Sequence, residues 1–507
     1  MNFIGTRDGV KVTAEEAVLS GVPENGGLFV PETFPVVSPE ERAEMLEMSY
    51  PERAAKILSK FFDKITADEW KEICEKSYSS FTGDDPLPLG RIDEGKYILE
   101  LFHGPTCACE DVSMVLFPKL FKKCKEVTGD KSDRLFLLAT SGDAGKAATE
   151  YFKNEKGFKV ATFYGEESIG KMQRIALCIS DGDNLLVGGV RGTFDDCKEA
   201  VEKAYASETL KVGLAEKGLK LSTISSQNIA RILPEIACYF SAYLDLVSSE
   251  QIEDGDKIDF AVPAGNGCGI VAGYYAKKMG LPVRKIFSSS NRNRAFYDFF
   301  KKGSLDLNRG YRHTMSPSMD VSVPANLERF LFEALGRNAK KTATKMSEIR
   351  KDGELLTEEE RKKLAQDIYA GFSGEDETVE AIYAVFEEYG YAMDTHTGVA
   401  AAVFDKYEEK REEKDDTPVV IVSVANFYKF PQESLYALDA TDVKDSFKGI
   451  KRLNLLTAMK PPKFLVDFRY NLPRFKLMLS ADAKKIEEEV LAFAGGKNAP
   501  NNATAKK

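Results

Sequence analysis

The stretch Arg134–Gly145, RLFLLATSGDAG, decides the fold class of this chain. Arg134–Ala139 is an apolar run typical of a buried strand, and Thr140–Gly145 is a glycine-containing turn that leads into a helix. A second unit of the same kind follows, in which Lys257–Val262 runs into the turn Pro263–Gly269 and then a helix. Strands that alternate with helices through short glycine turns predict parallel sheets and therefore an α/β protein.

Three further apolar runs have the length and composition of strands. They are Tyr97–Leu101, Val160–Tyr164 and Pro418–Val424. We therefore expect two parallel-sheet α/β lobes with a cleft between them, preceded by an N-terminal region. The expected boundaries are 1–95 for the N-terminal region, 96–235 for the first lobe, 236–440 for the second lobe with a charged helical insertion at 338–388, and 441–507 for a C-terminal extension with a disordered tail.

The composition is that of a soluble protein, which we expect in the cytoplasm. Of its 507 residues 43% are hydrophobic and 30% are charged, and the formal net charge of −10 argues against a nucleic-acid partner. No apolar run reaches about 18 residues and the start lacks the layout of a secretory signal, so no membrane partner is expected. Eight irregularly spaced cysteines indicate a reducing compartment, and three histidines argue against a His-rich metal site.

Two glycine turns have the layout of anion sites. Thr140–Gly145 and Gly265–Gly269 each connect a strand to a helix, so their backbone N–H groups lie at a helix N-terminus. Each turn taken alone is also explained as a tight connection without a ligand. Because the two turns belong to different lobes, their combination predicts an interlobe site for a small anionic ligand.

Motifs along most of the chain resemble those of threonine synthases, in the same order. The matching segments are ELFHGPTCACED (Glu100–Asp111), LLATSGDAGKAA (Leu137–Ala148), GTFDDC (Gly192–Cys197), ARILPEIACYFSAY (Ala230–Tyr243), GYYAKKMGLP (Gly273–Pro282), SPSMD (Ser316–Asp320), NLERFLFE (Asn326–Glu333), DTHTGVA (Asp394–Ala400) and YKFP (Tyr428–Pro431), together with the opening GTRDGVKVTAEEAVLSGVPENGGLFVPE. The resemblance extends to about residue 435. It identifies the chain as a member of the threonine synthase family.

The resemblance implies the fold of the fold type II enzymes that use pyridoxal phosphate (PLP). Threonine synthases convert O-phosphohomoserine and water to threonine and phosphate. In the family a lysine forms the Schiff base with PLP, and a glycine loop binds the cofactor phosphate. A hydroxyl residue on the last strand faces the pyridine nitrogen. Capture of the cofactor by an amine is the step that lets it act as an electron sink.

The family's Schiff-base lysine is replaced by Glu110 in this chain. A carboxylate forms no imine, so covalent attachment of PLP at this position is excluded. The replacement also reverses a charge. A charge of −1 at about 6 Å from a phosphate near −2 costs roughly 5 kcal/mol at an effective dielectric constant near 20. We therefore expect no covalently bound cofactor, and PLP only if the family function is retained.

The cofactor-binding positions also depart from the family pattern. The glycine loop reads Gly265, Asn266, Gly267, Cys268 and Gly269, where the family has G-N-F-G-N. The loop therefore lacks the family's aromatic residue and gains a cysteine side chain where a bare backbone is expected. On the last strand, Val424 replaces the hydroxyl residue and has no group that can contact a pyridine nitrogen.

The positions that correspond to the family's substrate site are partly retained. Thr140, Ser141, Gly142 and Asp143 match the family's serine-glycine turn, and Asn228 and Arg231 match a later segment. Arg231 is either a clamp for an anionic substrate or half of a buried structural ion pair. On the same side of the site, Glu166 replaces an expected phosphate-binding lysine.

Substitute chemistries for this site have weaker support. Lys119 lies about 13 Å farther along a helix than Glu110, and Lys146 is expected on a helix surface, so neither replaces the amine. His103 and His396 are catalytic residues or satisfied structural ones. A zinc site would need the side chains Cys107, Cys109, Cys268, His103 and Glu110, but Cys107 and Cys109 would point to opposite sides if that segment is extended. We expect no metal.

Three functions are therefore consistent with the sequence. The first is a pseudoenzyme with a binding or regulatory role, with a small anionic ligand or an active threonine synthase homologue as partner. The second is threonine synthase itself. The third is a cofactor-free enzyme that uses Glu110 as a general acid or base.

Overall fold

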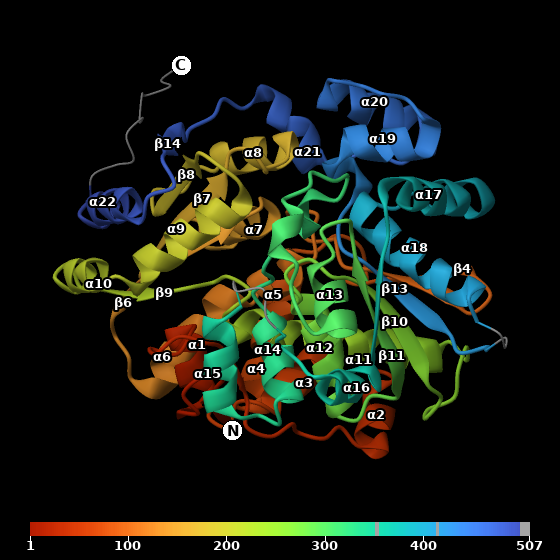
Figure 1. Cartoon of the computed structure of the whole chain (residues 1–507), viewed down its shortest axis with the longest axis horizontal. Helices are drawn as coiled ribbons and strands as arrows, with labels where there is room; N and C mark the ends of the chain where they lie inside the picture. The colour runs from red at the N-terminus through yellow and green to blue at the C-terminus, as the bar shows by residue number, and fades with distance from the viewer. Residues whose placement is uncertain (350–353, 412–414, 497–507) are drawn as a thin grey trace.

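The chain folds around three β-sheets, as the computed structural model in Figure 1 shows for residues 1–349, 354–411 and 415–496. The two larger sheets form the centres of two lobes, and helices cover their faces. Two parallel-sheet α/β lobes are the architecture that the sequence predicts. Among the described residues, no helix combines the length and apolar character needed to cross a bilayer.

The larger lobe contains a six-stranded sheet that is parallel except at one edge. In spatial order its strands are β12 (Ile368–Phe372), β11 (Val283–Ser290), β10 (Ile258–Pro263), β13 (Val419–Ser423), β5 (Lys96–Glu100) and β4 (Leu89–Asp93). β4 pairs antiparallel with β5. The residues of β10 and β13 are all buried, which fits a parallel sheet covered on both faces.

The smaller lobe contains a five-stranded parallel sheet. Its strands in spatial order are β14 (Leu477–Leu479), β8 (Leu185–Val190), β7 (Phe158–Gly165), β6 (Asp133–Thr140) and β9 (Leu219–Ser222). The helices of this lobe are α6 (Phe117–Thr128), α7 (Asp143–Tyr151), α8 (Lys171–Cys178), α9 (Phe194–Ala206), α10 (Glu208–Ala215) and α22 (Ala483–Ala494).

The N-terminal region is a small antiparallel sheet with four helices. The elements are β1 (Asn2–Gly5), β2 (Lys11–Thr13), α1 (Ala14–Ser20), β3 (Phe29–Pro31), α2 (Pro39–Met45), α3 (Tyr50–Ser59) and α4 (Ala67–Tyr78). Each helix begins at a Ser or Thr followed three residues later by Glu, which is the sequence of a capping box. α3 packs against α11 (Leu233–Ser248) of the larger lobe, so the region is joined to that lobe.

The remaining helices belong to the larger lobe or extend from it. They are α5 (Glu110–Met114), η1 (Ile229–Arg231), α12 (Cys268–Lys278), α13 (Ala295–Lys302), η2 (Leu307–Arg309), η3 (Pro317–Met319), α14 (Leu327–Ala334), α15 (Ala339–Ser347), α16 (Glu358–Ala365), α17 (Glu375–Tyr389), α18 (Thr395–Glu409), η4 (Phe427–Lys429), α19 (Pro431–Asp439), α20 (Ser446–Thr457), α21 (Lys463–Asp467) and η5 (Phe468–Tyr470). α18 packs across β10, β11 and β13, and α12 packs on β10 and β11.

The sheet order corrects two features of the expected organisation and gives the position of the C-terminal extension, which the sequence left open. The boundary at residue 95 separates β4 from β5, and β5 belongs to the larger lobe rather than to the first lobe at 96–235. The region 338–388 is not purely helical, because β12 is an edge strand of the six-stranded sheet. The C-terminal extension returns to the smaller lobe, where β14 pairs with β8. The expected disordered tail lies outside the described residues from 497 onward.

Candidate functional site

The segment before Glu110 lies directly against the segment after β13. Cys109 N donates to the carbonyl of Val424 at 2.7 Å, and Asn426 N donates to the carbonyl of Cys107 at 3.1 Å. Ala108 and Ala425 form an isolated antiparallel bridge between these two hydrogen bonds. The structure therefore places Glu110 beside Val424, as expected from the resemblance, at the carboxyl ends of two neighbouring strands.

Glu110 is the first residue of α5 and is half-buried. Its Oε2 accepts a weak hydrogen bond from Cys109 Sγ at 3.5 Å. Among the described residues no Lys or Arg is within 4.0 Å of its carboxylate. The position that holds an amine in the family therefore holds a carboxylate without an ion-pair partner.

The glycine loop leads from β10 into α12, and the ring of Phe296 lies beside the position where the family has an aromatic residue. Gly267 has a φ of +86°, and a Cβ added there would lie 2.4 Å from Cζ of Phe296. An aromatic ring from another helix thus occupies the space beside the position where the family carries an aromatic residue. The loop is fixed by its own side chain, since Asn266 Oδ1 accepts from Cys268 N at 2.9 Å.

Cys268 connects this loop to α11. Its thiol donates to Glu235 Oε1 at 3.4 Å and contacts the carbonyl of Arg231 at 3.8 Å. The pKa of Glu235 is raised to about 7, mainly by burial and to a smaller extent by the charge of Glu110, although Arg231 and the hydrogen bond from Cys268 lower it. Glu235 therefore links Glu110 electrostatically to the glycine loop. It was not singled out from the sequence, although a glutamate inside the apolar segment ARILPEIACYF was a usable signal.

One buried donor lies unpaired at the glycine loop within the part of the chain that the structure describes. Asn326 is fully buried, its backbone N donates to the carbonyl of Asn266 at 3.1 Å, and its Nδ2 has no hydrogen-bond partner among the described residues. An unpaired buried amide costs free energy, typically 1–3 kcal/mol. Together with the N-terminus of α12, this donor suits a small anion.

The serine-glycine turn at the end of β6 is held from within and from the other lobe. Thr140 Oγ1 accepts from Gly142 N at 2.9 Å and from Gly145 N at 2.8 Å. The carboxylate of Asp143 forms a buried ion pair with Lys429 at 2.8 Å and accepts from Ser318 Oγ at 3.4 Å. This ion pair between the lobes gives Asp143 a structural partner. The side chain of Ser141 in the same turn is half-buried.

Lys429 is a buried lysine whose amine is near enough to interact with the charge of Glu110, so we considered it as a substitute for the missing lysine. It lies in the YKFP motif, and its Nζ also donates to the carbonyl of Thr106 at 2.9 Å. Burial lowers the pKa of Lys429, but the charge and hydrogen bond of Asp143, with smaller contributions from Cys107 and Glu110, together raise that pKa above its ordinary value. A protonated amine in an ion pair is a poor nucleophile.

Asn228 and Arg231 are buried and bonded to neutral groups. Asn228 Nδ2 donates to the carbonyls of Val18 and Thr223 at 3.0 and 2.9 Å. Arg231 donates from Nε to Ser113 Oγ at 2.7 Å and from Nη1 to the carbonyl of Ile224 at 3.3 Å. No ion pair of Arg231 occurs among the described residues, so the alternative of a buried structural ion pair is not what the structure shows. Substrate binding by these residues stays a prediction.

The two motif histidines have polar partners. His103 Nε2 lies 2.6 Å from Glu100 Oε2. His396 Nδ1 lies 2.8 Å from Asp394 Oδ1, and its Nε2 accepts from Ser318 N at 3.2 Å. Both rings are therefore hydrogen-bonded, and the choice between a catalytic and a structural role stays as the sequence left it. Across residues 1–349, 354–411 and 415–496, no group of three or more His, Cys, Asp or Glu side chains has the arrangement of a metal site.

The residues that converge here do not fit covalently bound PLP. Position 110 has no amine, Lys429 is paired with Asp143, and Lys146 is paired with Glu150 at 2.9 Å. Val424 presents no hydroxyl to a pyridine nitrogen. The unpaired Asn326 amide instead fits an anion held without a covalent bond.

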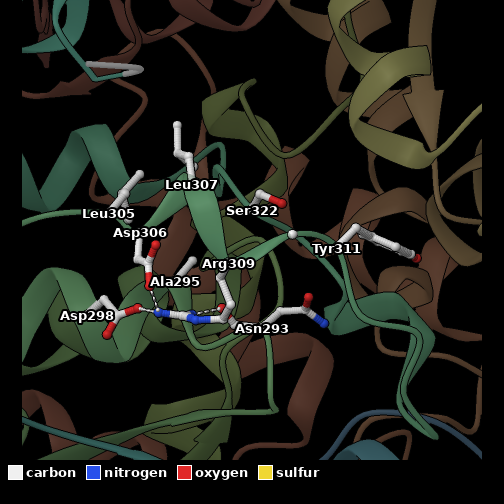
Figure 2. Close-up of a pocket in the computed structure, with 10 residues that line it drawn as sticks. Asn293, Ala295, Asp298, Leu305, Asp306, Leu307, Arg309, Tyr311 and Ser322 are labelled. Atoms are coloured by element: carbon white, nitrogen blue, oxygen red, sulfur yellow. Dashed lines mark hydrogen bonds and ion pairs between the residues drawn. The ribbon is translucent and has the colours of Figure 1, made fainter. Parts of the chain in front are cut away.

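A small pocket lies beside the polar loop that contains Asn293, and Figure 2 shows its lining. Its volume is about 40 Å³. Arg309 points toward Asp298, with which it forms an ion pair, and its Nη1 donates to the carbonyl of Asn293 at 2.8 Å. This volume holds a few waters, so the pocket is too small for a cofactor.

Comparison with known proteins gives a consistent result. The sequence profile described as "Threonine synthase N terminus" matches residues 2–78. The chain is 35% identical to mouse "Threonine synthase-like 1" over 464 residues, 88% of this chain and 60% of that protein. It thus spans less than two thirds of the length of these mammalian relatives. It is also 33% identical to the threonine synthase of Pseudomonas aeruginosa over 436 residues, 85% of this chain and 89% of the relative.

The similarity extends to solved structures. The PLP-bound threonine synthase of Brucella melitensis superposes with a TM-score of 0.83 at 28% identity, covering 97% of this chain and 99% of that chain. The yeast enzyme superposes with a TM-score of 0.82 at 25% identity, with the same coverage. The fold is thus that of the fold type II PLP-dependent threonine synthases. The chain belongs to the threonine synthase family.

Proposed function

We propose that this chain is a threonine synthase-like pseudoenzyme that has lost covalent PLP chemistry and has a binding or regulatory role. The observation that carries the proposal is the carboxylate of Glu110 in place of the Schiff-base lysine. Lys429 does not compensate for the loss, because it is committed to Asp143. The departures at Val424 and Cys268 support the same conclusion.

The ligand proposed for this site is a small anion bound without a covalent bond. The N-terminus of α12 and the unpaired Asn326 amide are the groups that would bind it. Isothermal titration with inorganic phosphate tests this directly. Binding that weakens in Asn326→Ala but not in Asn471→Ala, which changes an exposed amide, supports the proposal. The absence of heat with phosphate rejects an anion site for this probe.

A regulatory role would require contact with an active homologue. Mixing the chain with the threonine synthase of Pseudomonas aeruginosa, a 33% identical relative, provides a first test. Sedimentation velocity reports association, and phosphate release from O-phosphohomoserine reports the rate. Release of phosphate by this chain alone would instead support threonine synthase activity and reject the pseudoenzyme proposal.

A cofactor-free acid–base enzyme is a second candidate, favoured by one observation. Glu235 lies in the electrostatic field of Glu110 with its pKa raised to about 7, mainly by burial. Carboxyl groups with pKa values near the working pH are suited to proton transfer. If a reaction is found, Glu110→Ala is expected to lower its rate by 10²–10⁴-fold, and an unchanged rate would reject this candidate.

A further inference from the structure

The segment Lys444–Lys476 has a charge opposite to that of the rest of the chain. It contains nine Lys or Arg residues and two Asp residues, a net charge of +7. Because the whole chain carries −10, the remaining residues carry −17. The segment follows α19 and contains α20, α21 and η5. In Figure 1, α20 lies beside α19 at the top of the molecule, and α21 lies near α8.

The same segment exposes large apolar side chains. Leu455 is 76% exposed, Tyr470 is 75% exposed and Leu472 is 85% exposed, and Leu456 and Met459 are also exposed. Eleven large hydrophobic side chains are exposed in the described residues, and five of them belong to this segment. Exposed apolar residues that occur singly are normal, but this concentration indicates an interaction surface.

The exposed side chains of α20 and of the segments that follow it include both cations and large apolar groups. Ile450 and Leu453 are the buried residues that pack α20 onto the fold, whereas Lys451 and Leu455, four residues apart, are exposed together on its outer side. η5 lies beside α20, because the Arg469 guanidinium is 5.4 Å from the centre of the Phe447 ring. We call this the basic surface, and it comprises Lys448, Lys451, Arg452, Leu455, Leu456, Met459, Lys460, Lys463, Arg469, Tyr470 and Leu472.

Most of these cations are uncompensated. Arg452 pairs with Asp439 at 2.9 Å, and Arg474 pairs with Asp183 at 3.3 Å. Across the described residues, the lysines of the segment form no ion pair, and Arg469 contacts only a ring. The surface therefore retains its positive charge toward solvent.

We propose that the basic surface binds an anionic phospholipid membrane. Charge complementarity requires an anionic partner. Protein interfaces are depleted in Lys and enriched in Arg, whereas the segment contains six Lys and three Arg. Lysines around exposed Leu and Tyr are the pattern of interfacial membrane binding, in which apolar side chains enter the headgroup region.

The acidic remainder of the chain does not prevent this contact. At physiological ionic strength charges are screened over about 8 Å, so the local charge of the basic surface decides the interaction. The expectation of no membrane partner rested on the absence of a long apolar run and of a secretory signal, and this proposal departs from it for peripheral contact through the basic surface. The contact is peripheral and does not depend on the function proposed for the interlobe site.

Vesicle co-sedimentation of the full chain tests the proposal. Vesicles of phosphatidylcholine with about 30 mol% phosphatidylserine present an anionic surface, and vesicles of phosphatidylcholine alone serve as the neutral control. The chain is expected to sediment with the anionic vesicles only, and 0.5 M NaCl, about three times physiological ionic strength, is expected to release it.

Two pairs of variants separate local from total charge. Lys451→Glu with Lys463→Glu is expected to reduce partitioning by about tenfold or more. Lys203→Glu with Lys362→Glu changes the net charge equally at exposed positions elsewhere, and is expected to leave partitioning within about twofold. Leu455→Ser with Leu472→Ser is expected to weaken binding without changing its salt dependence.

Several results would overturn the proposal. These are no sedimentation with anionic vesicles, equal binding to neutral vesicles, or an equal loss in both charge-reversal pairs. Concentration-dependent self-association through the basic surface, without vesicle binding, would identify a second copy of the chain as the occupant instead. Circular dichroism of each variant checks that the fold is retained.

Discussion

At the scale of single residues, Glu235 is a buried carboxyl group on α11 that interacts with the charge of Glu110 at the start of α5. Glu235 is buried, its thiol partner Cys268 is neutral, and Arg231 only partly offsets the effect of burial. A buried carboxyl with these neighbours retains its proton at a higher pH than in the unfolded chain. The charge of Glu110 adds to this shift.

Stability is therefore expected to depend on pH through Glu235. The folded chain binds a proton at Glu235 more tightly than the unfolded chain does. The stabilisation from this proton is therefore complete below about pH 4.5 and is lost as pH rises through about 7. Glu235→Gln removes this titration. Between pH 4.5 and pH 8, the unfolding free energy of the Glu235→Gln variant is expected to rise relative to that of the parent by up to about 3 kcal/mol.

Urea denaturation at both pH values measures this change. The difference between variant and parent isolates Glu235 from other titrating carboxyls, such as Asp111, whose pKa burial raises to about 6. A difference that does not vary with pH would show that Glu235 does not titrate in this range.

Gly267 illustrates a backbone requirement that also involves packing. Its φ of +86° disfavours a side chain, and Phe296 leaves no room for a Cβ. Gly267→Ala is expected to lower the unfolding free energy by about 2–4 kcal/mol. Gly95→Ala is the matched control, since Gly95 has a φ of +69° with no neighbouring atom within 4 Å. An equal effect of the two substitutions in thermal denaturation would contradict a packing role for Phe296.

At the scale of elements, the Lys429–Asp143 ion pair connects the segment after β13 to the start of α7. Both side chains are buried. Removing one partner leaves an uncompensated charge, so Lys429→Met is expected to destabilise the fold by about 3–5 kcal/mol. Combining it with Asp143→Asn is expected to cost less than the sum of the two single substitutions.

Guanidinium chloride denaturation of the four chains of this cycle gives the coupling energy. Lys211→Met is a suitable control, because its partner Glu208 is 81% exposed and such pairs contribute about 0–1 kcal/mol. Additive effects of Lys429→Met and Asp143→Asn would show that the pair is not coupled.

Local sequence signals predict where the strands lie in the chain better than they predict which strands pair with each other. The apolar runs at Val160–Tyr164 and Pro418–Val424 are found as β7 and β13. The run Tyr97–Leu101 predicts a strand, but nothing in it indicates pairing with β13, more than 300 residues away. Strand pairing depends on long-range packing, which periodicity does not encode.

In the candidate site too, the sequence predicts the positions of the motifs but not the contacts between side chains of different motifs. Motif positions predict that Glu110, Val424 and the glycine loop lie together, since each follows a strand of a parallel sheet. The contacts of Phe296 with Gly267 and of Glu235 with Cys268 join residues from different motifs. A single sequence gives no indication of such pairs.

At the scale of the whole molecule, the chain crosses between the lobes and its C-terminal part closes the smaller one. β14 pairs with β8, and α22 packs against α9 and α10. Ile486 and Val490 of α22 are fully buried in the core of this lobe. The extension is therefore an integral part of the smaller lobe up to α22.

Truncation of a buried α22 side chain is expected to destabilise the smaller lobe. Ile486→Ala should lower the unfolding free energy by about 2–5 kcal/mol, since it removes apolar contacts and leaves a cavity. Glu488→Ala in the same helix changes an exposed side chain and should have an effect within about 0.5 kcal/mol. Similar midpoints for Ile486→Ala and the parent in chemical denaturation would show that α22 contributes little to the lobe.

The central claim is that the interlobe site of this threonine synthase homologue offers no amine for PLP. Incubation with PLP, reduction with borohydride and peptide mass mapping test it most directly, with the Pseudomonas aeruginosa enzyme as the positive control. We expect a reduced adduct on the control enzyme and none on any buried lysine of this chain. A stoichiometric adduct on Lys429, or on any other buried lysine near Glu110, would contradict the account.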